Sequence, residues 1–141
     1  MKVTIFQDVF KKNKEHAHVI QLATALKRIK EGKSKPLIEA IRNGSKDFKK
    51  KLPVVLFSGE FEARNDEALT KHSQFIVLDF DHIDVASSKA LLSTDPYVYS
   101  CWVSPSGDGL KALVKVSNPE RHRDHFRALR TYFNKQYDLE V

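Results

Sequence analysis

Hydrophobic residues follow two different periods along the chain. Short runs of β-branched and aromatic residues predict strands, and apolar residues at three- and four-residue steps predict helices. The expected strands are residues 3–6, 53–57, 75–81, 97–103 and 110–116, and a further strand is expected to start at residues 139–141. The expected helices are residues 16–30, 36–42, 85–92 and 118–136, with a short helix or turn at 45–51 and another at 65–71.

The order of these elements predicts the fold class. Strands alternate with helices, which is typical of an α/β or α+β protein. We expect a central mixed or antiparallel sheet flanked by helices, formed by one domain over residues 1–141. The last expected helix leads into the apparent start of a strand, where the sequence stops. We therefore expect the chain to be the N-terminal fragment of a longer protein.

Charge and cysteine content narrow the functional classes. The chain has 24 Lys and Arg against 18 Asp and Glu, a formal net charge of +6, which favours an anionic partner such as nucleic acid or nucleotide. Its one cysteine, Cys101, lies in an apolar run and is expected to be a small buried hydrophobe. No apolar run approaches the roughly 18 residues of a membrane span. We expect a cytoplasmic protein with no membrane partner.

Two aspartates end the most apolar of the expected strands. Residues 75–82 read Phe-Ile-Val-Leu-Asp-Phe-Asp-His, and side chains two apart on a strand share a face. Asp79 and Asp81 should therefore project together, while His82 should point away from Asp81. Paired carboxylates suit Mg²⁺ or Mn²⁺, ions that commonly bridge triphosphate oxygens. The alternative is that these acids only mark where the strand leaves the core.

A glycine- and serine-rich loop joins the last two expected strands. Residues 104–111 read Ser-Pro-Ser-Gly-Asp-Gly-Leu-Lys. Glycines let the backbone approach a ligand closely, successive amides can form an anion nest, and a lysine adds positive charge. The candidate nucleotide-binding residues are Ser104, Ser106, Gly107, Gly109 and Lys111. The loop does not have Walker A spacing, and ordinary hairpin-turn chemistry is the alternative. Together with the aspartates it predicts that Asp79, Asp81 and Lys111 converge on one face of a sheet.

These two motifs carry a family resemblance. The segments Val-Leu-Asp-Phe-Asp-His-Ile and Val-Ser-Pro-Ser-Gly-Asp-Gly-Leu-Lys-Ala-Leu-Val, with residues 52–61 upstream, resemble the BT4734-like N-terminal domain family, also called the VirE N-terminal domain. The resemblance runs from about residue 51 to the end. Such domains often precede a VirE or helicase-like region in proteins of mobile elements and phage.

The family is similar in turn to archaeo-eukaryotic primases and primase–polymerases. That likeness implies a primase–polymerase-like fold and a nucleotidyltransferase that uses a nucleoside triphosphate and a DNA or RNA template. By resemblance, Asp79 and Asp81 would hold the catalytic Mg²⁺ or Mn²⁺, and the loop residues would contact the nucleotide. The chain departs from the pattern in two ways. Lys111 stands where those enzymes have a histidine, and no third acid is evident.

Other functions remain open from the sequence. The departures favour a catalytically inactive module that binds nucleotide or nucleic acid, and a structural or interaction domain without a ligand is a third possibility. Two basic clusters can follow a phosphate backbone, with a solvated surface as the alternative. They are Lys46, Lys49, Lys50 and Lys51, and Arg121, Arg123, Arg127 and Arg130. The histidine pairs at 16 and 18 and at 122 and 125 lack the partners of a strong zinc motif.

Overall fold

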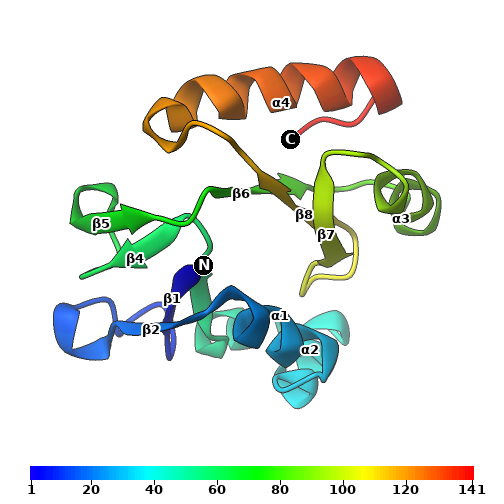
Figure 1. Ribbon diagram of the computed structural model, residues 1–141. Coiled ribbons are helices and arrows are strands. Elements are labelled where there is room, and N and C mark those ends of the chain that lie inside the picture. Colours follow the sequence, from blue (N-terminus) through cyan, green and yellow to red (C-terminus); the bar gives the residue numbers. More distant parts are fainter. The chain divides into compact units, whose positions relative to one another are not determined.

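The computed structural model describes residues 1–141 and has an α+β architecture (Figure 1). The chain divides into two compact units, Met1–Ser73 and Gln74–Val141. The strands form three small sheets, and every strand pair is antiparallel. The expected α+β class and antiparallel pairing are confirmed, although the strands do not join in one central sheet. That the whole chain is one domain stays a prediction. None of the helices combines the length and apolar character needed to cross a membrane.

The first unit contains two of the sheets. Strands β1 (Lys2–Phe6), β2 (His18–Gln21) and β3 (Val54–Leu56) pair in the order β2-β1-β3, and β4 (Gly59–Phe61) pairs with β5 (Leu69–His72). The other elements are α1 (Leu22–Lys30), α2 (Lys35–Arg42) and the 3-10 helices η1 (Lys14–His16), η2 (Lys46–Lys51) and η3 (Asp66–Ala68).

A buried threonine connects the two sheets of this unit. The hydroxyl of Thr4 on β1 donates to the carbonyl of Gly59 at 2.9 Å and accepts from the amide of Phe61 at 2.8 Å. Thr4 is fully buried, so both hydrogen bonds satisfy a polar group that would otherwise be costly inside the core. At Gly59 a Cβ atom would collide with the backbone of Lys71, which explains why the β4–β5 hairpin starts with glycine.

Three sequence predictions fail in local detail. Residues 18–21 are strand β2 instead of the start of a helix, because they pair with β1 from Lys2 to Ile5. Their β-branched residues, Val19 and Ile20, suit that pairing. Strands β4 and β5 were not expected, since each is short and lacks clear alternation. Residues 139–141 form no strand; Leu139 instead packs into the core of the second unit.

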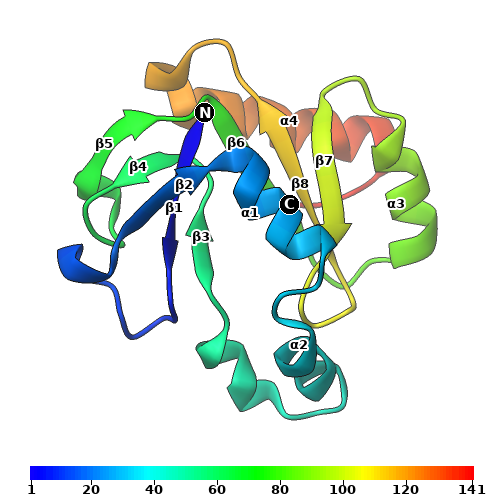
Figure 2. The same cartoon turned by 60° about the horizontal axis from the view of Figure 1, so that its bottom comes forward.

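The second unit is a three-stranded sheet with two helices. It contains β6 (Phe75–Phe80), α3 (Val85–Ser93), β7 (Val98–Val103), β8 (Leu110–Lys115), the 3-10 helix η4 (Pro119–Arg121) and α4 (His122–Tyr137), with the strands in the order β6-β8-β7. The bounds of the three strands and of α3 agree with the sequence prediction to within one residue, and the helix expected over residues 118–136 is formed by η4 followed by α4. In both views α4 runs along the sheet and α3 lies beside β7 (Figures 1 and 2).

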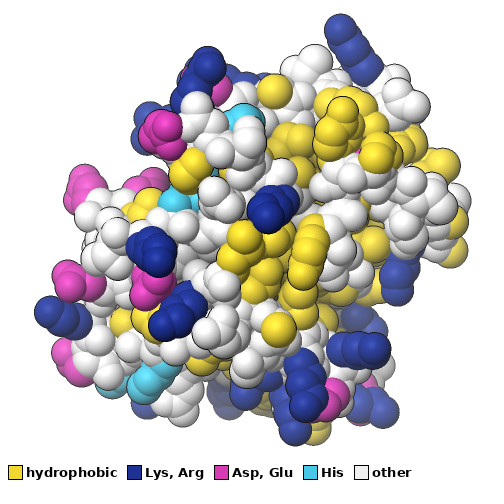
Figure 3. Space-filling view, in the orientation of Figure 1, with side chains coloured by type: hydrophobic (Ala, Val, Ile, Leu, Met, Phe, Trp, Pro, Cys, Tyr) yellow, Lys and Arg dark blue, Asp and Glu magenta, His cyan; other side chains and the backbone are white.

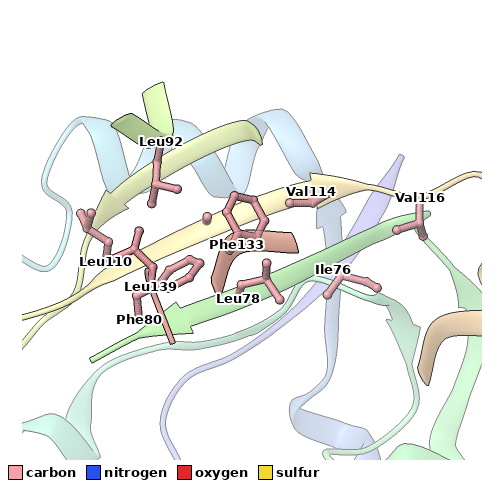
Figure 4. Packing of buried hydrophobic residues seen from close by; sticks show 10 residues of the cluster. Ile76, Leu78, Phe80, Leu92, Leu110, Val114, Val116, Phe133 and Leu139 are labelled. Carbon is pink, nitrogen blue, oxygen red and sulfur yellow. The ribbon is translucent and has the colours of Figure 1, made fainter. Parts of the chain in front are cut away.

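Alternation along the strands explains the core of this unit. Ile76, Leu78 and Phe80 of β6 point toward α4, and alternate residues of β8 join them (Figure 4). Phe133 of α4 is fully buried, and its ring lies 5.6 Å from that of Phe80 in an edge-to-face arrangement. The other members of the cluster are Leu92, Leu110, Ala112, Val114, Val116 and Leu139. The core therefore occupies one face of the sheet.

A buried carboxylate ties the end of α4 to the turn between α3 and β7. The Oδ2 atom of Asp95 accepts hydrogen bonds from the hydroxyls of Tyr132 at 2.7 Å and Tyr137 at 2.6 Å. Its Oδ1 atom accepts from the amide of Tyr97 at 2.8 Å. Asp95 is only 5% exposed, so these three donors compensate the cost of burying its charge. Sequence reasoning did not identify these tyrosine partners.

This cluster makes stability depend on pH in the alkaline range. The hydrogen bonds to Asp95 are the first cause that raises the pKa of Tyr132 and of Tyr137 above the usual value of 10.0. A raised pKa in the folded state stabilises the protein fully below the unfolded-state pKa, and that stabilisation is lost as the pH rises through the folded-state value. Wild type should have a higher free energy of unfolding than Tyr132→Phe/Tyr137→Phe, and we expect this difference to shrink above about pH 10.

Urea unfolding of both proteins across that pH range measures this difference. Tyr99→Phe, which removes an exposed hydroxyl, serves as the control and should follow wild type throughout. A difference that stayed constant or grew with rising pH would contradict the role of the two hydroxyls.

Candidate functional site

The ends of all three strands of the second unit meet at one edge of the sheet. Phe80, the last residue of β6, is opposite Leu110, the first of β8, and Val103, the last of β7, is opposite the same Leu110. The loop of residues 104–109 joins β7 to β8 at this edge. The amide of Ser104 donates to the carbonyl of Gly109 at 2.9 Å and closes the loop. The carboxylate strand and the glycine loop therefore share one edge, as the sequence predicted.

Asp79 and Lys111 form the central pair of the site. They are Cα partners across β6 and β8, and the Lys111 Nζ atom lies 2.6 Å from the Asp79 Oδ1 atom. Directly opposite residues share a face, and this is the face away from the core, because Leu78 and Phe80 point inward. The Lys111 side chain is 32% exposed and the Asp79 side chain is 52% exposed. An ion pair this accessible contributes only about 0–1 kcal/mol, so Lys111 can exchange Asp79 for another anion at small cost.

Gly109 brings the loop against the end of β6. A Cβ atom at this position would lie 2.5 Å from the carbonyl oxygen of Phe80 and 3.3 Å from both the Cα and the Oδ1 atoms of Asp81. Only glycine permits this approach without displacing backbone. Asp81 itself is exposed just past the strand end. The structure thus brings Asp79 to Lys111 and Asp81 to Gly109.

A chain of hydrogen bonds organises the loop side chains. The Ser104 and Ser106 hydroxyl oxygens lie 3.0 Å apart, and the Ser106 hydroxyl donates to the Asp108 Oδ1 atom at 2.6 Å. The Asp108 Oδ2 atom lies 2.8 Å from the His82 Nδ1 atom. The hydrogen bond from Ser106 is the main cause that lowers the pKa of Asp108, and His82 also lowers it. Asp108 is therefore held as a carboxylate between the loop and the strand end. Gly107, in the left-handed region with φ of 86°, lets the loop turn.

Sequence reasoning missed the partnership of His82 with Asp108. Strand alternation predicted that His82 would point away from Asp81, but the strand ends at Phe80 and His82 adopts φ of 54°. The amide of Ile83 also donates to the carbonyl of Asp108 at 3.1 Å, which anchors the same loop. No local signal in the sequence links residues 26 positions apart. The nearest clue is an acid inside a tight loop, where its carboxylate must find donors.

An aromatic residue extends the central pair across the sheet. Trp102 on β7 is the Cα partner of Lys111, so Trp102, Lys111 and Asp79 form one row across three strands. Residues opposite one another share a face, which places the indole on the same side of the sheet as the ion pair. An aromatic ring beside a cation and a carboxylate is a surface on which a base can stack.

The remaining sequence candidates, apart from Cys101 on β7, lie on other elements of the chain. No group of three or more His, Cys, Asp or Glu side chains is arranged to hold a metal ion. Cys101 packs partly buried against the core cluster, close to the predicted role of a small hydrophobe. The lysines of residues 46–51 lie on η2 in the first unit, and the arginines lie at positions 121–130 on η4 and α4.

Comparison with known proteins identifies the family of the chain. The model of the BT4734-like, N-terminal domain family matches residues 47–140, which include the whole candidate site. No curated protein and no solved structure matches the chain.

Proposed function

The chain belongs to the family of BT4734-like N-terminal domains, and its candidate site lies wholly within the residues that the family model matches. We propose that the chain binds a nucleoside triphosphate with Mg²⁺ or Mn²⁺. We further propose that this binding serves nucleotidyl transfer of the primase–polymerase kind, on a DNA or RNA template. The full protein would be a replication protein of a mobile element or phage, with a downstream helicase-like region.

The observation that supports the proposal is that one end of the sheet holds Asp79 beside Lys111 and Asp81 beside Gly109. Asp79 and Asp81 offer oxygen ligands only, which suits a hard divalent cation. Mg²⁺ sites at nucleotides are commonly built from one or two carboxylates plus substrate phosphates, so a pair of aspartates fits this ion without a third protein ligand. Asp79 and Asp81 would hold such a cation, which would supply positive charge against the phosphates.

The other residues of the site bind and orient the nucleotide. The Lys111 ammonium leaves Asp79 and pairs with a phosphate oxygen, a contact that a lysine makes as a point charge. The turn at Gly107 and Gly109 brings backbone amides close to the phosphates, and the Ser104 and Ser106 hydroxyls can donate to them. Trp102, in the same row as Lys111, stacks on the base.

Calorimetric titration of a nucleoside triphosphate with Mn²⁺ tests the proposal. We expect wild type to bind in a metal-dependent way and Asp79→Asn/Asp81→Asn to lose binding by more than tenfold, about 1.4 kcal/mol or more. The control Asp66→Asn/Glu67→Gln changes the net charge equally at two exposed residues of η3. It should bind as wild type does.

Two results would contradict the proposal. The first is nucleotide binding that is equal with Mn²⁺ and with a chelator. The second is a site variant that is folded by circular dichroism and binds as tightly as wild type. Trp102 is the single tryptophan, and its indole lies in the same row as Asp79 and Lys111. Quenching of its fluorescence therefore provides an independent measure of nucleotide binding.

One observation favours a second candidate, a module that binds nucleotide or nucleic acid without catalysis. Asp79 and Asp81 are not joined by a third acidic, histidine or cysteine side chain in a group that could hold a metal. Template-directed incorporation of labelled nucleotide by the full-length protein separates the two. Incorporation that Asp79→Asn abolishes favours the enzyme, whereas metal-dependent binding without incorporation favours the module.

A further inference from the structure

The positive charge of the chain is concentrated in one short segment. Residues 27–51 contain ten Lys and Arg against three Asp and Glu, a formal charge of +7. The other 116 residues contain fourteen Lys and Arg against fifteen Asp and Glu, a formal charge of −1. The net charge of +6 for the whole chain therefore arises in these 25 residues. Lysines spread evenly for solubility would not produce this distribution.

Three consecutive helices of the first unit carry these residues. They are the second half of α1, then α2, then η2, and α2 and η2 pack against each other. The buried residues of α1, Leu22 and Ala25, lie one turn apart, which leaves Lys27 and Lys30 for the exposed side. Lys46 and Lys49 on η2 are three residues apart and so lie above one another on a 3-10 helix. In Figure 3 dark-blue side chains gather over α2 and η2. We call residues 27–51 the basic segment.

Much of this charge is not neutralised within the protein. Glu31 pairs with Lys27 at 3.7 Å and with Lys33 at 3.6 Å, and Glu39 pairs with Lys35 at 3.9 Å. Those contacts are long and exposed, so they contribute little. On η2, Lys46, Lys49 and Lys50 are exposed and make no ion pair. Lys51 lies 4.8 Å from the centre of the Phe48 ring, a cation–π contact that leaves its charge uncompensated.

From this arrangement we infer that the basic segment binds the sugar–phosphate backbone of a nucleic acid. The exposed, unpaired lysines of η2, together with the weakly paired lysines of residues 27–35, can replace several condensed counterions of a polyanion, and the release of those ions drives binding. A basic helix that binds a membrane also inserts an apolar face. Here the one exposed large hydrophobic residue between positions 22 and 52 is Ile29, at 37% exposure. The chemistry therefore suits a hydrated phosphate chain.

The basic segment shares no residue with the proposed nucleotide site. It lies in the first unit, and residues 27–46 precede the residues that the family model matches. It requires neither Asp79 nor Asp81, so nucleic-acid binding should persist in Asp79→Asn/Asp81→Asn. A failure of metal-dependent nucleotide binding would leave this inference standing, and the reverse also holds.

The salt dependence of oligonucleotide binding tests the inference. Fluorescence anisotropy with the full chain, a labelled DNA single strand, its duplex and an RNA of the same sequence gives the affinity across a NaCl series. Each phosphate contact contributes about 0.9 to the slope of log K against log salt for duplex and about 0.7 for single strands. We expect Lys46→Gln/Lys49→Gln/Lys50→Gln to reduce that slope by about 2 to 3.

A charge-matched variant supplies the control. Lys89→Gln/Lys115→Gln/Lys135→Gln removes three exposed lysines of the second unit and leaves the same net charge as the η2 variant. Its slope should stay at the wild-type value, and thermal melting should show both variants folded. An equal loss in both variants would overturn the inference, since net charge alone would then explain binding. Stronger binding to phosphatidylserine vesicles than to any oligonucleotide would also overturn it, in favour of a membrane surface.

Discussion

Phe133→Ala should lower the free energy of unfolding by about 3–5 kcal/mol, the range for deleting a fully buried phenylalanine. Phe133 is fully buried and is the only fully buried residue of α4. Its ring makes edge-to-face contacts with Phe80 at 5.6 Å and Tyr132 at 5.0 Å and stacks with Tyr137 at 6.1 Å. Alanine would remove these contacts and leave a cavity between the helix and the sheet.

Urea unfolding followed by tryptophan fluorescence measures this loss. Trp102 is the single tryptophan and lies in the same unit as Phe133, so the signal reports on the affected core. Phe10→Ala is the control, because the Phe10 side chain is 70% exposed and should change stability by less than about 0.5 kcal/mol. A loss below about 1 kcal/mol for Phe133→Ala would mean that α4 is not held by this residue.

Gly109→Ala should destabilise the second unit and weaken nucleotide binding together. The added Cβ would lie 2.5 Å from the Phe80 carbonyl oxygen, a distance that requires backbone to move. Overpacking of this kind typically costs about 1–3 kcal/mol, and occasionally more. The movement would shift the loop relative to Asp81 and Lys111, the residues that the proposed site needs at fixed positions. We expect the triphosphate affinity to fall by at least about tenfold.

Gly44→Ala separates the two effects of this substitution. Gly44 has φ of 106° and an open surrounding, so alanine there strains the backbone without touching the site. That variant should lose stability but keep wild-type affinity in the same Mn²⁺ titration. If Gly109→Ala bound nucleotide as tightly as Gly44→Ala does, the close approach of the loop to β6 would have no role in binding.

Local patterns predicted the second unit much better than the first. Strands β6, β7 and β8 and helices α3 and α4 each have a long apolar period and a clear turn or cap, such as Asp84, whose side chain accepts from the amide of Ser87 at 3.2 Å. Strands β2, β4 and β5 are three or four residues long. Strands this short exist because a partner strand lies beside them, and no window of local sequence contains that partner.

The candidate site also has some contacts that the sequence predicted and others that it did not. The positions of Asp79 and Lys111 on facing strands follow from strand period and loop length, and the 2.6 Å contact between them matches the part of the predicted convergence that concerns these two residues. The partnership of His82 with Asp108, and of Asp95 with two tyrosines of α4, joins residues 26 to 42 positions apart. Such contacts depend on how the elements pack.

The amino-acid sequence alone determined which segments of the second unit form strands and helices. It also determined the carboxylate pair, the glycine loop, the concentration of charge in residues 27–51 and the family to which residues 47–140 belong. The elements, the two motifs and the concentration of charge depend on residue type and spacing within short segments, whereas the family assignment draws on the pattern of residues 47–140 as a whole. Only the tertiary structure determined the three small sheets, the row of Trp102, Lys111 and Asp79, and the hydrogen-bond chain from Ser104 to His82. Strand pairing and side-chain contacts between residues far apart in the sequence form only after packing brings their segments together, so their partners are set by the tertiary structure.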